Sequence, residues 1–289
     1  MRILVTGKNG QLGRSTQKLV NTGPKIENNQ SPNDFIFVGR EELDLSSESS
    51  ISNYFGNNKF DIIINCAAYT QVDKAEQEEE LANQINHLAV KQLASIASNQ
   101  QSRLIHISTD YVFDGESNKL YLETDTPNPI NAYGRTKLAG EKSLQTLMPM
   151  NALVIRTSWL YSEYGNNFFS TMLRLGREQD ELSVVNDQMG SPTYATDLAD
   201  AILEIIRHKK FRDAGQTTQI YHYSNEGEIS WYELAKEIFK IAKVDCKVNP
   251  ISTQQYPTPA KRPRNTLMNK DKIVKVFKIK ISNWKSSLN

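Results

Sequence analysis

Cysteine is scarce in this sequence. Only Cys66 and Cys246 occur among 289 residues, and they lie far apart with no metal-type spacing. A disulfide framework and a cysteine-based zinc site are therefore both disfavoured. We expect two free thiols in a reducing compartment, and no bound metal.

The sequence also lacks an excess of one charge and any long apolar run. Lysine and arginine number 34 against 33 acidic residues, which gives a net charge of +1. A nucleic-acid-binding protein typically has a basic stripe, but the one basic cluster here is "KRPR" at 261–264. No apolar run approaches the ~18 residues that a membrane span needs. The chain opens on the strand-like "MRILVTG", which leaves no room for a signal peptide, so we expect a cytoplasmic protein.

Short apolar runs alternate with helical patterns in the first half. The runs cover residues 2–7, 34–40, 61–67, 103–109 and 152–158. Such nearly continuous apolar runs are typical of strands that are buried on both faces. The alternation predicts an α/β fold, a doubly wound, Rossmann-like parallel sheet. Ligands of such folds bind beyond the carboxyl ends of the strands.

A long helix is predicted over residues 81–100. One of its faces carries the apolar residues Leu81, Ile85, Leu88, Leu93 and Ile96. Since these recur at helical spacing, we expect that face to pack on the sheet.

The pattern loosens after residue 158. Helices are predicted over 166–179 and 195–210, and strands over 182–188 and 220–225. Ser230 and Glu233 form a capping box that opens another helix. The stretch 249–264 holds four prolines and predicts an extended loop. We expect interleaved domains: 1–158 plus roughly 182–225 for a dinucleotide, and roughly 159–181 and 226–289 as a smaller substrate lobe.

Glycine is also infrequent, yet three of the 14 glycines fall at Gly7, Gly10 and Gly13. They form the pattern T-G-x-x-G-x-x-G between the first strand and the first helix. Glycines permit a sharp turn and a close backbone approach, and the N–H groups of a helix start bind a pyrophosphate. The pattern therefore predicts a dinucleotide site.

The second strand indicates which dinucleotide binds. It ends "VGREELDL", with Arg40 at the position where a carboxylate would favour NAD and a basic residue would accept a 2′-phosphate. Glu41 and Glu42 follow at once and weaken the distinction. We expect NADPH, with NADH also accepted, and we place Asp44 and Leu45 near the adenine.

A tyrosine and a lysine lie four residues apart in "NAYGRTK". On a helix, Tyr133 and Lys137 share one face. A cationic Lys137 nearby would lower the pKa of the Tyr133 phenol and make it a better acid. Thr109, 24 residues upstream, ends a predicted strand, and its hydroxyl can hold a substrate carbonyl oxygen. On its own, the pair fits an ordinary helix surface better than an active site.

Longer strings resemble a known family. "AAYTQVDKAE" (67–76), "ISTDYVFDG" (107–115), "NAYGRTKLAGE" (131–141) and "VVNDQMGSPTYATDLA" (184–199) look like those of the dTDP-4-dehydrorhamnose reductases, which are extended short-chain dehydrogenases/reductases. The resemblance covers nearly the whole chain. It departs at Thr266 and Asn269, where the family usually has Ser and Asp.

The resemblance implies an oxidoreductase of dTDP-rhamnose biosynthesis, on the route to cell-surface polysaccharide. NADPH would reduce the C4 ketone of dTDP-4-dehydro-L-rhamnose, with Thr109, Tyr133 and Lys137 as the catalytic residues and Lys137 also on the nicotinamide ribose. The cofactor would contact Gly7, Asn9, Gly10, Gln11, Leu12, Arg40, Asp44, Leu45, Cys66, Ala67, Ala68, Tyr69, Tyr133 and Lys137. The nucleotide sugar would contact Thr109, Asp110, Tyr111, Trp159 and Arg262. Relatives can use acidic surfaces in subunit pairing, and this chain has the acidic run "EQEEE" at 76–80, so a homodimer is possible.

Two other functions remain as alternatives. Dehydratases and epimerases share the cofactor half, but dehydratases usually carry a Glu soon after the Ser/Thr position, where this chain has Asp110 and Tyr111. The regulatory subunit of methionine adenosyltransferase resembles the same reductases and acts through protein contact. The presence of Thr109, Tyr133 and Lys137 favours catalysis.

Overall fold

A six-stranded sheet forms the centre of the molecule. The computed structural model describes residues 1–23, 27–28, 31–213 and 215–288. The strand order is β12-β7-β6-β5-β1-β4, and every neighbouring pair is parallel. The strands are β1 (Arg2–Thr6), β4 (Asp34–Val38), β5 (Ile62–Asn65), β6 (Arg103–Thr109), β7 (Ala152–Thr157) and β12 (Gln219–Tyr223). The predicted doubly wound sheet is confirmed, and the five strands predicted in the first half all occur.

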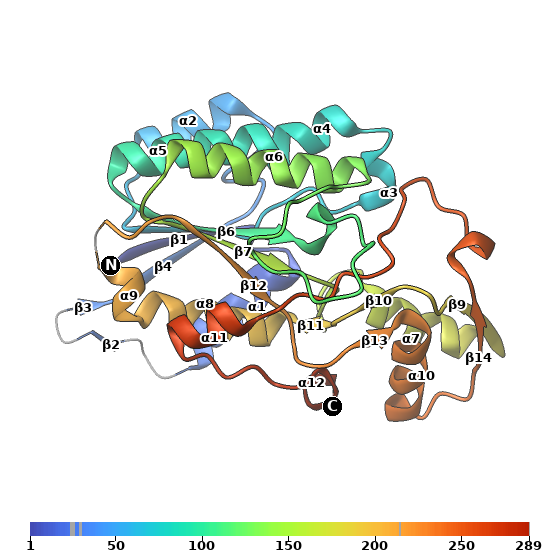
Figure 1. The fold of residues 1–289 in the computed structure, drawn as a ribbon. Helices are drawn as coiled ribbons and strands as arrows, with labels where there is room; N and C mark the ends of the chain where they lie inside the picture. Colours follow the sequence, from blue (N-terminus) through green and yellow to red (C-terminus); the bar gives the residue numbers. More distant parts are fainter. Residues whose placement is uncertain (24–26, 29–30, 214, 289) are drawn as a thin grey trace.

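Helices cover both faces of the sheet (Figure 1). On one face lie α2 (Glu48–Gly56), α5 (Ala89–Gln100) and α6 (Ala132–Leu147). On the other lie α1 (Gln11–Thr22), α8 (Ala195–Arg207), α9 (Lys209–Arg212) and α11 (Asp271–Phe277). Each layer encloses a core of buried hydrophobic residues, which explains why the strands carry apolar side chains on both faces.

The order of the strands defines where a ligand binds. The chain passes from β1 to the edge strand β4 and then returns to β5, on the other side of β1. The crossovers on the two sides of β1 therefore diverge. This leaves a crevice at the carboxyl ends of β1 and β5, the usual ligand site of such sheets.

The predicted helix over 81–100 has an unexpected middle section. It consists of α4 (Glu79–Asn83), the π-helix η1 (Gln84–Leu88) and α5 without a break. The predicted apolar face was partly wrong, because Leu81 and Leu88 are 38% and 39% exposed. A π-helical turn holds an extra residue and so rotates the face that packs on the protein.

A smaller lobe lies beside the carboxyl ends of the sheet (Figure 1). It contains α7 (Phe168–Glu178), α10 (Trp231–Ala242) and two two-stranded sheets, β9 (Glu181–Val185) with β14 (Lys247–Ile251) and β10 (Met189–Gly190) with β13 (Ile229–Ser230). The capping box of Ser230 and Glu233 is confirmed at the start of α10. The segment 249–264 was predicted as a loop. It instead begins inside β14, because residues 247–251 pair with β9.

The remaining elements are short. They are β2 (Glu27–Asn28), β3 (Ser31–Pro32), α3 (Val72–Ala75), the 3-10 helices η2 (Asp110–Val112) and η3 (Thr253–Gln255), β8 (Leu160–Tyr161), β11 (Thr193–Tyr194) and α12 (Trp284–Leu288). The helix predicted over 195–210 is divided at His208 into α8 and α9. No helix in the described part of the chain is both long and apolar enough to span a bilayer.

Candidate active site

A cavity of about 880 Å³ opens at the carboxyl ends of β1, β5 and β6, facing the small lobe. Its lining includes the cofactor residues expected from the sequence: Gly7, Asn9, Gly10, Gln11, Leu12, Arg40, Asp44, Leu45, Cys66, Ala67, Ala68, Tyr69, Tyr133 and Lys137. It also includes four of the five expected substrate residues: Thr109, Asp110, Tyr111 and Trp159. Arg262 is the expected residue that does not line it.

The glycine loop turns tightly into α1. Gly7 has φ +71°, and a Cβ there would lie 2.9 Å from the Ala67 nitrogen. A Cβ on Gly13 would lie 2.2 Å from the Gly7 carbonyl oxygen. Gly10 is the N-cap of α1, and no side chain caps the helix. The first N–H groups of α1 therefore face the cavity without a side-chain acceptor, which is the arrangement that a pyrophosphate fits.

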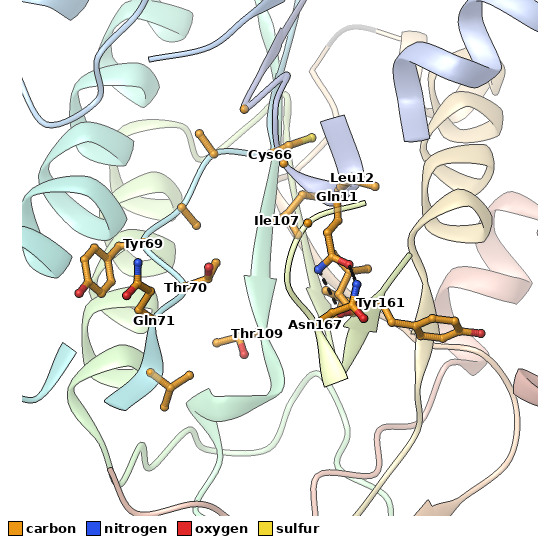
Figure 2. A pocket seen from close by; sticks show the side chains of 18 of the residues that line it. Gln11, Leu12, Cys66, Tyr69, Thr70, Gln71, Ile107, Thr109, Tyr161 and Asn167 are labelled. Atoms are coloured by element: carbon orange, nitrogen blue, oxygen red, sulfur yellow. Dashed lines mark hydrogen bonds between the residues drawn. The ribbon is translucent and has the colours of Figure 1, made fainter. Parts of the chain in front are cut away.

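Gln11 links the loop to the small lobe. Its Nε2 donates to the Leu160 carbonyl at 3.2 Å. Its Oε1 accepts hydrogen bonds from Asn167 Nδ2 at 2.8 Å and Ser162 Oγ at 3.0 Å. Figure 2 shows Gln11 and Asn167 meeting at one side of the cavity, with Thr109 projecting from another. The side chain of Gln11 therefore positions the lobe relative to the loop.

Two ion pairs lie at the end of β4, where the adenosine 2′ position is expected. Arg40 Nε donates to Asp44 Oδ2 at 3.2 Å. Lys8 Nζ pairs with Glu42, whose other oxygen accepts from the Gly39 N–H at 2.8 Å. These bonds hold the pKa of the Glu42 carboxyl below its usual value. Lys8 was missed in the sequence, since it lies in the glycine loop rather than at the end of the second strand.

Thr109 ends β6, and its side chain is already engaged. Its hydroxyl donates to Asp110 Oδ1 at 3.0 Å and accepts from the Tyr111 N–H at 3.2 Å. Asp110 is buried, which raises the pKa of its carboxyl to about 6. Its second oxygen, Oδ2, has no hydrogen-bond partner among the described residues. That oxygen is shielded from solvent, and the neighbouring Thr266 hydroxyl acts to lower the pKa of the carboxyl.

The start of α6 places Tyr133 beside Thr109. Asn131 caps the helix by accepting from the Gly134 N–H at 2.8 Å. A Cβ at Gly134 would lie 2.1 Å from the Tyr111 carbonyl oxygen, so only glycine lets α6 approach this closely. The rings of Tyr111 and Tyr133 meet edge to face with centroids 5.7 Å apart. One turn on, buried Lys137 donates from Nζ to the Ile107 carbonyl at 2.6 Å.

Burial is the main influence on the protonation of Tyr133 and Lys137. Burial raises the pKa of Tyr133 to about 12, although the Thr109 hydroxyl acts in the opposite direction. Burial is the largest influence on the Tyr133 phenol, and the lowering of its pKa by Lys137 stays a prediction. Burial lowers the pKa of Lys137 itself to about 8. At neutral pH the phenol is protonated and the amine is mostly charged, as a proton donor and its cationic neighbour require.

Aromatic side chains form the lobe side of the cavity. Trp159 has φ +46°, and its ring lies against Gly190, where a Cβ would be 2.5 Å from the indole. It stacks on Trp231 with centroids 3.4 Å apart, and Trp231 contacts Phe168. Trp231 was missed in the sequence, because only the fold brings the start of α10 to this wall.

The Arg262 guanidinium forms an ion pair with Asp73. It forms two hydrogen bonds to Asp73, at 2.9 and 2.7 Å, and one to the Ala260 carbonyl. Asp73 belongs to α3, so the pair joins the proline-rich segment to the edge of the sheet domain. Among the described residues, no group of three or more His, Cys, Asp or Glu side chains is arranged to hold a metal ion.

Asn86 is a further residue that the sequence did not reveal. It lies in the π-helix η1 and is 1% exposed. Its amide accepts from the Tyr69 N–H at 2.9 Å and donates to the Tyr69 carbonyl at 3.0 Å. It thus fixes the backbone of the cavity-lining segment after β5. No sequence signal marks a π-helix.

The whole chain is similar to a known protein family. The family description "RmlD substrate binding domain" matches residues 1–289. The chain belongs to this family. A dTDP-4-dehydrorhamnose reductase of Aggregatibacter actinomycetemcomitans is 40% identical, over 99% of this chain and 97% of that protein. The family resemblance seen in the motif strings is thereby confirmed.

Two solved structures of the family are also similar to the whole chain. A dTDP-4-dehydrorhamnose reductase of Clostridium acetobutylicum has a TM-score of 0.90 and 39% identity, and the match covers 100% of this chain and 97% of that one. The Bacillus anthracis reductase, solved in complex with NADP, has a TM-score of 0.88 and 38% identity, with 99% and 96% covered.

Proposed function

We propose that this protein reduces the C4 ketone of dTDP-4-dehydro-L-rhamnose with NADPH and forms dTDP-L-rhamnose. The observation that carries the proposal is that Thr109, Tyr133 and Lys137 line the same cavity as the glycine loop at the start of α1. The family membership and the NADP complex of the Bacillus anthracis relative support the cofactor and the substrate class.

The protein residues would bind, orient and protonate. Bound NADPH supplies a hydride to the ketone carbon. Tyr133, protonated because its pKa is about 12, donates its proton to the ketone oxygen. Thr109 holds that oxygen once its hydroxyl turns from Asp110 to the substrate. Lys137 provides a positive charge close to where the phenolate forms.

The two parts of the molecule would hold different ligands. The sheet domain (1–158 and roughly 182–225) would hold the dinucleotide, and the lobe (roughly 159–181 and 226–289) the sugar, against Trp159. Residues 24–26, 29–30, 214 and 289 of these ranges lie outside the described residues. Arg262 would contact the diphosphate only by giving up Asp73. We retain a cytoplasmic location and a homodimer as proposals.

The direct test is an assay of NADPH oxidation by the purified protein. We expect reduced-nicotinamide absorbance to fall only when dTDP-4-dehydro-L-rhamnose is present, with dTDP-L-rhamnose as the product. The same assay with dTDP-glucose should give no oxidation, since that sugar has no C4 ketone. Cofactor binding without turnover would contradict the reductase and favour the regulatory-subunit alternative.

Cofactor choice gives a second test. Glu42→Gln removes the carboxylate that pairs with Lys8, so Lys8 becomes more available to a 2′-phosphate, while Arg40 keeps its ion pair with Asp44. We expect kcat/KM for NADPH relative to NADH to rise several-fold, and Lys8→Ala to lower the same ratio. Glu48→Gln, a charge change at the start of α2, serves as the control. An unchanged ratio in both test variants would remove Lys8 and Glu42 from cofactor selection.

A further inference from the structure

A buried ion pair lies behind the active site and outside the cavity. Glu141 and Arg156 are each 1% exposed. Arg156 Nη2 donates to Glu141 Oε2 at 2.7 Å, and Arg156 Nε donates to Glu141 Oε1 at 3.0 Å. The guanidinium also lies 5.1 Å from the centre of the Phe113 ring. A buried pair of this kind adds little net stability compared with apolar side chains of the same shape.

The pair connects to the catalytic residues through two neighbouring positions of β6. Glu141 lies one helical turn beyond Lys137 on α6, so both face the sheet. Lys137 Nζ donates to the Ile107 carbonyl, and the Ser108 hydroxyl donates to the Glu141 carboxylate. Thr109 follows directly. The carboxylate therefore anchors α6 to the end of the strand that carries the threonine.

The groups around Lys137 define its electrostatic setting. Burial raises the pKa of the Cys66 thiol, at the end of β5, to about 12, and lowers the pKa of His106 on β6 well below its usual value. Both are uncharged at neutral pH. Desolvation is the largest influence on Lys137 and lowers its pKa, and Glu141 is the main group acting in the opposite direction.

The other charged groups lie further along the same structure. Asp110, after β6, acts on Tyr133 and Tyr111. His222 on β12 packs by Phe113, and its pKa is lowered to about 3 by burial and by Arg156, so it stays neutral. Among the charged groups that act on Lys137, Glu141 therefore has the largest effect, and its ion pair with Arg156 fixes the position of that carboxylate.

We propose that Glu141, held by Arg156 and Ser108, is a positioning residue that keeps the Lys137 ammonium in place at the cavity wall, where it would contact the nicotinamide ribose. Glu141 does not itself line the cavity, so it acts through Lys137 and Ser108, which do. The inference rests on the proposed reductase function for its catalytic meaning. Its effect on Lys137 also governs the binding of NADPH, which can be measured without turnover.

The test compares pH profiles. In the wild type, kcat and NADPH affinity should both decline as pH rises through about 8, because Lys137 then loses its proton. In Glu141→Gln, the carboxylate that raises the pKa of Lys137 is lost, so the declines in kcat and in NADPH affinity should both begin about one pH unit lower. Glu141→Asp keeps the charge and should restore most of the profile. Lys142→Gln, an exposed charge change on the same helix, should leave the profile in place.

A second variant guards against misfolding. Glu141→Gln leaves the Arg156 charge buried without its partner, which destabilises the fold. The double variant Glu141→Gln with Arg156→Met removes both charges and should melt near the wild-type temperature. The pH at which its kcat and NADPH affinity decline should be lower than in the wild type, by less than in Glu141→Gln alone. A loss of activity that is equal at all pH values, with the NADPH-binding profile unmoved in the folded double variant, would overturn the proposal.

If the wild type binds NADPH but does not turn over the nucleotide sugar, the proposed reaction fails. The pH dependence of NADPH binding, followed by nicotinamide fluorescence, still decides the role of Glu141 in that case. The two failures are therefore distinguishable.

Discussion

Replacing Tyr133 by phenylalanine is expected to lower kcat by about 10²- to 10⁴-fold, the usual contribution of a positioned general acid. The phenol is protonated at neutral pH because burial raises its pKa to about 12, and it lies beside Thr109 at the end of β6. Phenylalanine keeps the ring and its edge-to-face contact with Tyr111. Affinity for NADPH should therefore stay within a small factor of the wild-type value.

The measurement is steady-state turnover alongside a fluorescence titration of NADPH. Tyr54→Phe is the matched control, since it removes the same oxygen from a tyrosine of α2 outside the cavity lining. Turnover of Tyr133→Phe near the wild-type rate would exclude this residue as the acid. A large loss of NADPH binding in the same variant would point to a damaged site rather than a missing proton.

The strands and the glycine loop could be predicted because their signals are local. Five strands follow from nearly continuous apolar runs, which only a sheet covered on both faces can bury. Gly7 and Gly13 are needed where the backbone crosses itself within a few residues. The candidate catalytic residues Thr109, Tyr133 and Lys137 were predicted from spacing along one helix, from the end of one strand and from the family resemblance.

Other features depend on contacts between distant segments, and the sequence did not reveal them. Asn86 matters because a π-helical turn aims it at the Tyr69 backbone. The pairing of β14 with β9 joins residues 66 positions apart, such as Lys247 and Glu181, and carries Pro250 within it. The pKa of Tyr133 follows from burial, which a charge four residues away in the sequence does not indicate.

The partner of the charged residue Arg262 could not be predicted from the sequence either. A basic segment next to an expected diphosphate site suggested a direct contact. In the fold, Asp73 of α3 accepts two hydrogen bonds from this guanidinium. Charge in the sequence indicated that a partner exists, and only the fold determined which partner it is.

Gly13→Ala is expected to disrupt the dinucleotide site. The added Cβ would lie 2.2 Å from the Gly7 carbonyl oxygen and 3.0 Å from the Lys8 Cα, all backbone atoms that cannot rotate away. Either α1 or the loop must shift, at a cost of about 1–3 kcal/mol for overpacking. The N–H groups at the start of α1 then move relative to the phosphate position, and we expect NADPH affinity to fall about 10-fold or more.

Gly56→Ala is the matched control, because a Cβ there meets nothing within 4 Å. Calorimetric titration of NADPH and thermal melting should separate the two variants: Gly13→Ala with weak binding and a lower melting temperature, and Gly56→Ala unchanged in affinity. Wild-type affinity in Gly13→Ala would mean that the loop does not hold the phosphates. The atoms that a Cβ on Gly13 would meet are backbone atoms of Gly7 and Lys8, so a side-chain substitution elsewhere would not relieve the clash. Any side chain at this position adds the same Cβ, and Gly13→Ser should therefore be as damaging as Gly13→Ala.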